Sequence, residues 1–95
     1  MYARVVRFTD VDPERMADRQ AAAEDREGPP EGVPATRIQV FHDPEQRTAV
    51  VVQHYSTEED MRAGEAVLDA MDPSETPGTR ASVDRCALKF ERQVS

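Results

Sequence analysis

His42 and His54 are the only histidines of the chain, and His54 is the residue best suited to acid–base chemistry. His54 follows an apolar run, Ala49 to Val52, and precedes a predicted helix that starts at Ser56. The N-terminus of a helix favours a neutral imidazole or a bound anion beside it. His54 could therefore act as a base or hydrogen-bond donor toward a phenol or an enol. The alternative is a partly exposed histidine at a strand end that hydrogen-bonds to its neighbours.

A metal site built from both histidines is not expected. In the hairpin register described below, His54 lies opposite Ala35, seven residues from His42 along the strand. At about 3.3 Å per residue the separation is roughly 23 Å, too long for one metal ion. Cys86, the single cysteine, could lie near one histidine at most. Because no cluster of His, Cys and carboxylate has ligand spacing, we predict neither a metal nor another bound cofactor.

Three polar side chains could bind a substrate. Arg37 and Gln39 project from the same predicted sheet face as His54 and could hold a carboxylate or a carbonyl group. Arg4, in the first strand, could do similar work. A polar dimer interface is the competing interpretation for all three residues.

The aromatic and sulfur-bearing candidates are weaker. Tyr55 and Tyr2 could orient a flat substrate by ring stacking and a hydroxyl group, although tyrosines at strand ends usually pack with the hydroxyl in water. Cys86 alternates with Leu88 and Phe90, so we expect a small buried residue rather than a nucleophile. His54 is therefore the candidate catalytic residue, and the candidate substrate-binding residues are Tyr55, Arg37 and Gln39.

Composition limits the classes of protein to consider. Ninety-five residues make one small domain, and such a chain buries only about 60–65% of its unfolded surface. We therefore expect self-association to complete the core. A formal charge of −7 argues against nucleic acid or an anionic membrane as a partner, although the charge also simply favours solubility. The unpaired cysteine, and the lack of a signal-peptide pattern or a long apolar run, favour a cytoplasmic protein.

The chain is predicted to begin with a strand over Tyr2 to Thr9 and a helix over residues 13–27. Asp12 is a good N-cap, and Pro13 fits the first helical position. The helix should end at Gly28-Pro29-Pro30. Its inward stripe would either leave room above the sheet or let the helix sit close, and we expect close packing because protein interiors are dense. The stripe consists of Met16, Ala17, Gln20, Ala21 and Ala23 or Glu24.

A β-hairpin is predicted next, with strands from Ala35 to His42 and from Ala49 to Tyr55. The four residues from Asp43 to Gln46 have the composition of a type I turn, which would place His42 opposite Arg47. Alternation then separates two surfaces. One carries Thr36, Ile38, Val40, Ala49, Val51, Gln53 and Tyr55, and the other carries Arg37, Gln39, Phe41, Val50, Val52 and His54. Helices would cover one surface, and a second subunit could cover the other.

A second helix and a last strand complete the predicted fold. Ser56 and Glu59 form a capping box at the start of the helix, which should end before Asp72-Pro73. A loop over Ser74 to Arg80 leads to a strand over Ala81 to Arg92. The order is β-α-β-β-α-β, which in one four-stranded antiparallel sheet is the ferredoxin-like α+β arrangement.

Three segments of the chain carry a family resemblance. They are Met-Tyr-Ala-Arg-Val at the start, the hairpin that leads into Ser-Thr-Glu-Glu-Asp-Met-Arg-Ala-Gly-Glu, and Ala-Ser-Val-Asp-Arg before the end of the chain. Together they resemble the dimeric α+β barrel superfamily, and most closely its small antibiotic-biosynthesis-monooxygenase-like proteins of actinobacterial type. The resemblance implies a single ferredoxin-like domain over residues 1–95. It also implies a homodimer that pairs two sheets into a barrel, and a small-molecule pocket between sheet and helices.

The resemblance implies several activities, among them cofactor-free oxygenases acting on polyketide phenols, haem-degrading enzymes, cyclases and isomerases. The residue patterns of the oxygenase and haem-degrading branches include Asn and Trp, which this chain lacks, so we transfer no catalytic residue.

Three functions stay open. The first is a cofactor-independent, monooxygenase-like enzyme that acts on a small aromatic or polyketide-type molecule in a pocket lined by His54, Tyr55, Arg37 and Gln39. The second is a non-catalytic dimer that binds a small molecule, and the third is an accessory dimer without a ligand. A base inside a pocket favours the first, a pocket without a titratable group favours the second, and a filled interior favours the third.

Overall fold

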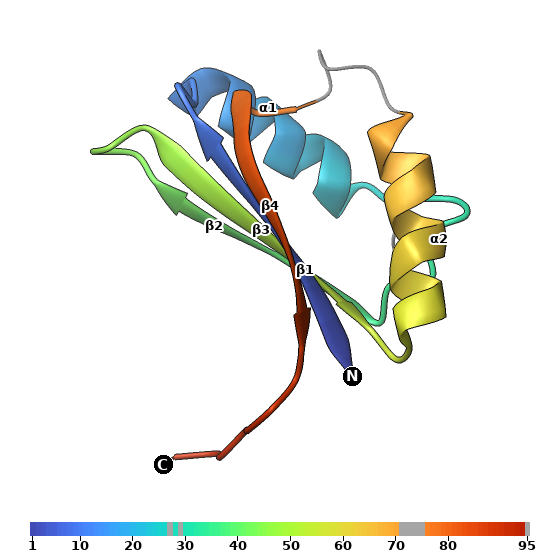
Figure 1. The fold of residues 1–95 in the computed structure, drawn as a ribbon. Helices are drawn as coiled ribbons and strands as arrows, with labels where there is room; N and C mark the ends of the chain where they lie inside the picture. Colours follow the sequence, from blue (N-terminus) through green and yellow to red (C-terminus); the bar gives the residue numbers. More distant parts are fainter. Residues whose placement is uncertain (27, 29, 71–75, 95) are drawn as a thin grey trace.

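The computed structural model describes residues 1–26, 28, 30–70 and 76–94, which form one antiparallel sheet and two helices (Figure 1). The elements in chain order are β1 (Tyr2–Thr9), α1 (Pro13–Glu24), β2 (Arg37–Asp43), β3 (Thr48–Tyr55), α2 (Glu58–Asp69) and β4 (Thr79–Ala87). The strands lie in the order β2-β3-β1-β4, and each neighbouring pair is antiparallel. Both helices lie on one side of the sheet (Figure 1). The predicted ferredoxin-like βαββαβ arrangement is confirmed.

Helix α1 begins as predicted and ends earlier. Asp12 is its N-cap, with Oδ1 accepting a hydrogen bond from the N–H of Glu14 at 2.9 Å. The last helical residue is Glu24, three residues short of the predicted end, and Asp25 is the C-cap. Two adjacent acidic residues at this end, with no basic residue in the last turn, oppose the helix dipole and favour termination. Residues 27 and 29 lie outside the described part of the chain.

The β2–β3 hairpin has a register two residues away from the predicted one. His42 pairs with Ala49 and Asp43 with Thr48, so residues 44–47 form the loop. Asp43 Oδ1 accepts from the N–H of Gln46 at 3.1 Å, and Arg47 adds a residue in the left-handed region at φ 56°. A type I turn followed by a left-handed residue is a common hairpin connection. The predicted pairing of His42 with Arg47 is therefore wrong, but an even shift leaves every side chain on its predicted face.

Strand β4 begins and ends earlier in the sequence than predicted. It spans Thr79–Ala87 rather than 81–92, so the last two residues of the predicted loop belong to the strand. Ala87 pairs with Tyr2, the first residue of β1, and one further bond joins the N–H of Leu88 to the carbonyl of Met1 at 2.9 Å. The described pairing of β4 therefore stops beside the first residues of β1.

The N-cap of α2 is Thr57 rather than Ser56. Its Oγ1 accepts from the N–H of Asp60 at 3.1 Å. The predicted capping box at Ser56 and Glu59 is therefore wrong by one residue, because Thr57 and Asp60 repeat the same spacing of hydroxyl and carboxylate. The helix ends at Asp69 with Ala70 as C-cap. The predicted stop at residues 72 and 73 lies outside the described residues.

The helices cover the sheet face that carries Val51 and Tyr55. One core cluster, between the sheet and α1, consists of Val6, Phe8, Val11, Met16 and Ala49. A second cluster, against α2, consists of Val33, Tyr55 and Met61. The opposite face of the sheet, called the open face below, carries Arg37, Gln39, Phe41, Val50, Val52 and His54, and no described element covers it (Figure 1). The predicted division into two surfaces is confirmed.

Arg4 fixes α2 to the sheet. Its side chain is 3% exposed, and Nη1 donates to Oε1 of Gln53 at 3.2 Å. Its Nε donates to Oε1 of Glu65 at 3.3 Å, and its Nη2 donates to Oδ1 of Asp69 at 3.0 Å. Arg4 therefore binds groups of its own chain on the covered face. No described helix is long and apolar enough to cross a membrane.

Candidate functional site

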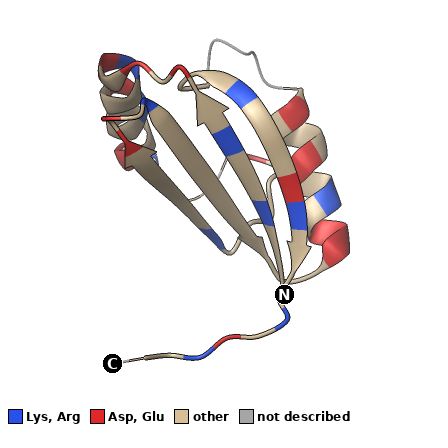
Figure 2. Cartoon of the chain, turned by 60° about the vertical axis from the view of Figure 1, so that its left-hand side comes forward, with Lys and Arg blue, Asp and Glu red and all other residues tan. Residues whose placement is uncertain are grey.

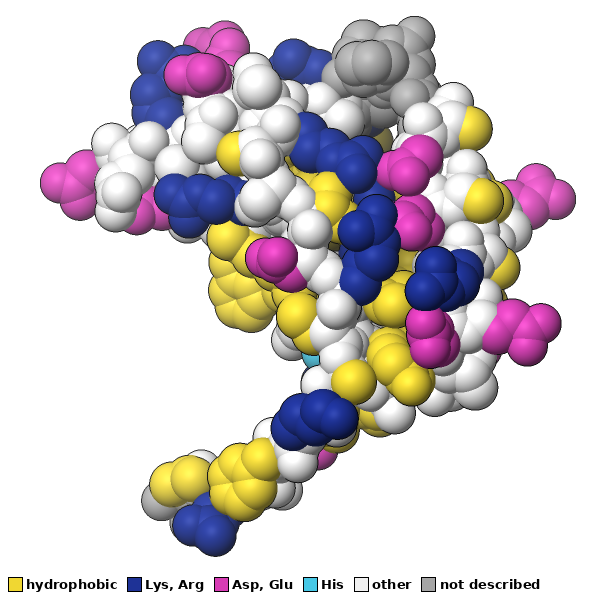
Figure 3. All heavy atoms as spheres, in the orientation of Figure 1, with side chains coloured by type: hydrophobic (Ala, Val, Ile, Leu, Met, Phe, Trp, Pro, Cys, Tyr) yellow, Lys and Arg dark blue, Asp and Glu magenta, His cyan; other side chains and the backbone are white. Residues whose placement is uncertain are grey.

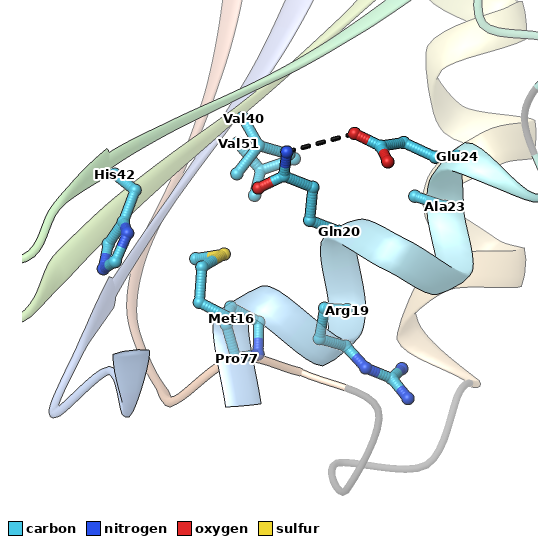
Figure 4. A pocket seen from close by; sticks show the side chains of 9 residues that line it. All are labelled: Met16, Arg19, Gln20, Ala23, Glu24, Val40, His42, Val51 and Pro77. Atoms are coloured by element: carbon cyan, nitrogen blue, oxygen red, sulfur yellow. Dashed lines mark hydrogen bonds between the residues drawn. The ribbon is translucent and has the colours of Figure 1, made fainter. Parts of the chain in front are cut away.

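A cavity of about 450 Å³ lies between α1 and the sheet. Helix α1 supplies Met16, Arg19, Gln20, Ala23 and Glu24, and the facing wall consists of Val40, His42, Val51 and Pro77 (Figure 4). The predicted close packing of α1 is therefore wrong. Met16 is the buried residue of this helix, and the rest of the predicted inward stripe is exposed. The small residues of the stripe leave a space above β2 and β3 that none of the described side chains fills.

His42 is the half-buried histidine in the wall of this cavity. Its side chain comes from β2, on the same sheet face as Val40 and Val51 but apart from both (Figure 4). Nε2 is buried and has no hydrogen-bond partner among the described residues. A buried polar atom without a partner costs about 1–3 kcal/mol, and most native structures avoid it. The position therefore suits a ligand that bonds to the imidazole.

The remaining walls are mainly apolar. Met16, Val40, Val51 and Pro77 present hydrocarbon or thioether surface to the cavity. At the helical side Gln20 Nε2 donates to Oε1 of Glu24 at 3.1 Å, and both residues are exposed. Apolar walls with a few well-placed polar groups are typical of small-molecule pockets. A neutral imidazole in such a pocket can accept a proton from a ligand hydroxyl group.

The sequence-based site residues do not share this cavity. His54, Arg37 and Gln39 lie on the open face, where Arg37 pairs with His54 across the strands. His54 Nε2 donates to Oε1 of Gln39 at 3.0 Å. Because of the register shift, His54 lies opposite Arg37 and not opposite Ala35 as predicted. Their roles in binding or catalysis stay predictions.

Tyr55 lies on the covered face, apart from the other three candidates. It is fully buried, and its hydroxyl donates to Oε1 of Gln53 at 3.5 Å. Burial raises the pKa of the phenol, which the charge of Arg4 partly offsets. The four candidates therefore do not line one pocket. Tyr2 packs beside the second core cluster.

Cys86 is exposed, so the prediction of a buried cysteine is wrong for this chain. It pairs with Ala3 and belongs to the open face. The prediction assumed that the alternation of Cys86 with Leu88 and Phe90 marked a buried strand face. In fact β4 ends at Ala87. Among the described residues no group of three or more His, Cys, Asp or Glu side chains could hold a metal ion.

Sequence reasoning weighed His42 only as a metal ligand. A signal for its position was present, because strict alternation along β2 places His42 with Val40. Both residues then share the face of Val51. No comparable pattern in the sequence indicates the depth of the cavity.

Comparison with known proteins supports the fold. No protein-family model matches the chain, and no curated protein matches it either. A crystal structure of a putative antibiotic biosynthesis monooxygenase from Deinococcus radiodurans superposes with a TM-score of 0.53. The match covers 100% of this chain and 97% of that one, at 12% sequence identity. The chain therefore has the ferredoxin-like α+β fold of that protein, in keeping with the resemblance drawn from the sequence.

Proposed function

We propose that the protein is a cofactor-independent, monooxygenase-like enzyme that acts on a small aromatic or polyketide-type molecule bound between α1 and the sheet. The observation that supports this proposal most is the buried Nε2 of His42, unpartnered among the described residues, in the wall of an apolar cavity of about 450 Å³. A base inside a pocket is the feature that an enzyme of this kind requires. The fold shared with the Deinococcus radiodurans protein is consistent with it.

The proposed chemistry begins with proton transfer. A phenol or enol hydroxyl donates its hydrogen bond to Nε2 of His42, which accepts the proton and leaves an electron-rich anion. The anion reduces O₂. One oxygen atom enters the carbon framework and the other leaves as water, with both hydrogens of that water supplied by the substrate. Met16 and Val51, which are buried and half-buried, present apolar surface that limits the contact of water with the anion.

Binding without turnover is the alternative function. The positions of two ionisable side chains in the cavity wall favour it. Glu24 accepts a hydrogen bond from Gln20, and Arg19 points away from the cavity (Figure 4). Among the described residues that line the cavity, His42 is therefore the ionisable side chain that a bound ligand would contact. A single imidazole can hold a hydroxyl group in place without any reaction.

Calorimetric titration with a panel of phenols and 1,3-diketones, followed by measurement of oxygen consumption, tests the proposal. We expect wild-type protein to bind at least one class of compound and to consume oxygen with it. His42→Gln keeps a polar side chain of similar size but cannot accept a proton at neutral pH, so binding should persist while turnover falls at least 100-fold. His54→Gln is the contrasting variant from the open face. Equal turnover in His42→Gln and wild type would contradict the role of His42, and binding without oxygen consumption would favour the alternative.

We also propose that the open face forms a homodimer interface. Val50 and Val52 lie half-buried on this face, and Phe41 is 57% exposed beside them. A short chain with a small core commonly covers such a surface by self-association. A two-fold dimer would bring the same patch of each copy together.

A further inference from the structure

The chain after β4 leaves the body of the molecule as an extended arm, residues 88–94 (Figures 1 and 2). The bond from the N–H of Leu88 to the carbonyl of Met1 is the last backbone hydrogen bond between this arm and the body among the described residues. The arm nevertheless carries large apolar side chains. Leu88 is 48% exposed, Phe90 is 72% exposed and Val94 is 82% exposed. Side chains of this kind are unfavourable in water unless another surface covers them.

A notch separates the arm from the open face of the same chain (Figure 3). On the side of β4 it holds a hollow of about 400 Å³, bounded by Ala3 and Cys86 on the sheet and by Leu88 and Phe90 on the arm. On the side of β2 a second hollow of about 260 Å³ lies between Arg37 and Glu91 of the arm. His54 borders both hollows. The arm therefore does not fold back onto its own sheet, and the space beside it is open along the strand ends.

We infer that this arm packs on the open face of a second copy of the chain, which occupies the notch. The inference rests on the proposed homodimer and goes beyond it, because it assigns a clasping segment outside the sheet. Two sheets packed face to face lie about 10 Å apart. Seven extended residues reach up to about 23 Å at 3.3 Å each, so the arm can cross from one sheet to the other.

Apolar surface and symmetry favour a second copy as the occupant. Leu88, Phe90 and Val94 of the arm are exposed apolar side chains, and the open face carries Phe41, Val50 and Val52. Packing the first set against the second removes apolar surface of both from water. The guanidinium of Arg92 lies 5.3 Å from the centroid of the Phe90 ring, which keeps this charge beside the aromatic anchor. Under two-fold symmetry each copy donates one arm and receives one, which leaves neither arm exposed.

Photo-crosslinking from position 90 tests the inference directly. p-Benzoylphenylalanine introduced in place of Phe90 keeps an aromatic side chain, and irradiation at micromolar protein concentration should give a covalent dimer on a denaturing gel. Mass spectrometry should locate the crosslink in peptides of the open face of the second copy. The same probe in place of Asp18, on the exposed side of α1, is the control and should give no covalent dimer. Crosslinks confined to one chain would overturn the inference.

Sedimentation measurements separate this inference from the dimer proposal. Phe90→Asp should raise the dimer dissociation constant at least tenfold. Gln93→Asp adds the same charge to the same arm without removing an apolar side chain and should raise it less than threefold. A wild-type dimer that Phe90→Asp leaves unchanged would overturn the role of the arm while the dimer stands. A wild-type monomer at all concentrations would overturn both.

Discussion

The phenol ring of Tyr55 occupies the place where a side chain at position 64 would stand. A Cβ added to Gly64 would lie 2.6 Å from Oη, 2.8 Å from Cε1 and 3.0 Å from Cζ of that ring. Tyr55 is fully buried, so the ring has no free space to move into. The close approach of α2 to the sheet therefore requires glycine at this position.

Gly64→Ala should lower the stability of the protein. Alanine favours a helix over glycine by about 1 kcal/mol, but overpacking a core costs about 1–3 kcal/mol, and three contacts at or below 3.0 Å place this site near the upper limit. We expect a net loss of about 1–2 kcal/mol, measured by chemical denaturation. Ala63→Gly, at an exposed position of the same helix, reports the propensity effect alone. A Gly64→Ala protein as stable as wild type would contradict the steric argument.

His42→Leu should stabilise the ligand-free protein while weakening ligand binding. Leucine removes the buried Nε2 that lacks a partner in the described chain, and relief of such a group gains about 1–3 kcal/mol at most. The midpoint of thermal unfolding should therefore rise. Any phenol that binds wild type should bind the variant at least tenfold more weakly.

The contrasting variant is His54→Leu. It removes the hydrogen bond to Gln39 on the open face, so the unfolding midpoint should fall or stay the same. A lower midpoint for His42→Leu would indicate that Nε2 already has a bonding partner in solution, such as an ordered water molecule.

The fold could be predicted because its main signals are local. Asp12 and Pro13 mark the start of α1, and period-two alternation assigns the two faces of the hairpin whatever its exact register. The predicted register of the hairpin was wrong because the register depends on one residue. Arg47 adopts a left-handed conformation that a non-glycine residue rarely takes. The predicted end of β4 was wrong because the length of a strand depends on its partner strand, and β1 starts at Tyr2.

The candidate site was harder to predict than the fold. Alternation correctly assigned His54 and Tyr55 to opposite faces, so a single pocket containing both was not compatible with the predicted surfaces. The cavity beside His42 arises from the distance between α1 and the sheet, which depends on how few side chains of α1 reach inward. That distance is a tertiary property. The residues between Met16 and Glu24 are compatible with close packing or with a cavity, and only the three-dimensional structure distinguishes the two.

Val52→Asp should disrupt the proposed homodimer. Val52 lies half-buried on the open face, where it pairs with Gln39 on one side and Val5 on the other. A carboxylate at this position would be buried without a partner in the interface, at a cost of several kcal/mol. Analytical ultracentrifugation should show monomer or unfolded protein. Ala66→Asp, on the exposed side of α2, adds the same charge away from the interface and should remain dimeric. A stable dimer of Val52→Asp would place the interface elsewhere.

Glu65 should make stability depend on pH in the acid range. The hydrogen bond from Arg85 lowers the pKa of this carboxyl group most, and the hydrogen bond from Arg4 lowers it further, while burial opposes both. A carboxyl group whose pKa is lower in the folded state stabilises that state fully above its unfolded pKa, about 4.3. This contribution is lost as the pH falls through the folded pKa. We therefore expect the free energy of unfolding to decrease below about pH 5.

Comparison of wild type with Glu65→Gln isolates this contribution from that of the other carboxyl groups. Glutamine retains a hydrogen-bonding oxygen but carries no charge, so the variant should be less stable at pH 7, and the difference from wild type should narrow as the pH falls toward 3. Glu59→Gln is the matched control, because Glu59 is exposed in the first turn of the same helix. A constant difference between Glu65→Gln and wild type from pH 7 to pH 3 would show that Glu65 keeps the same pKa in the folded and unfolded states.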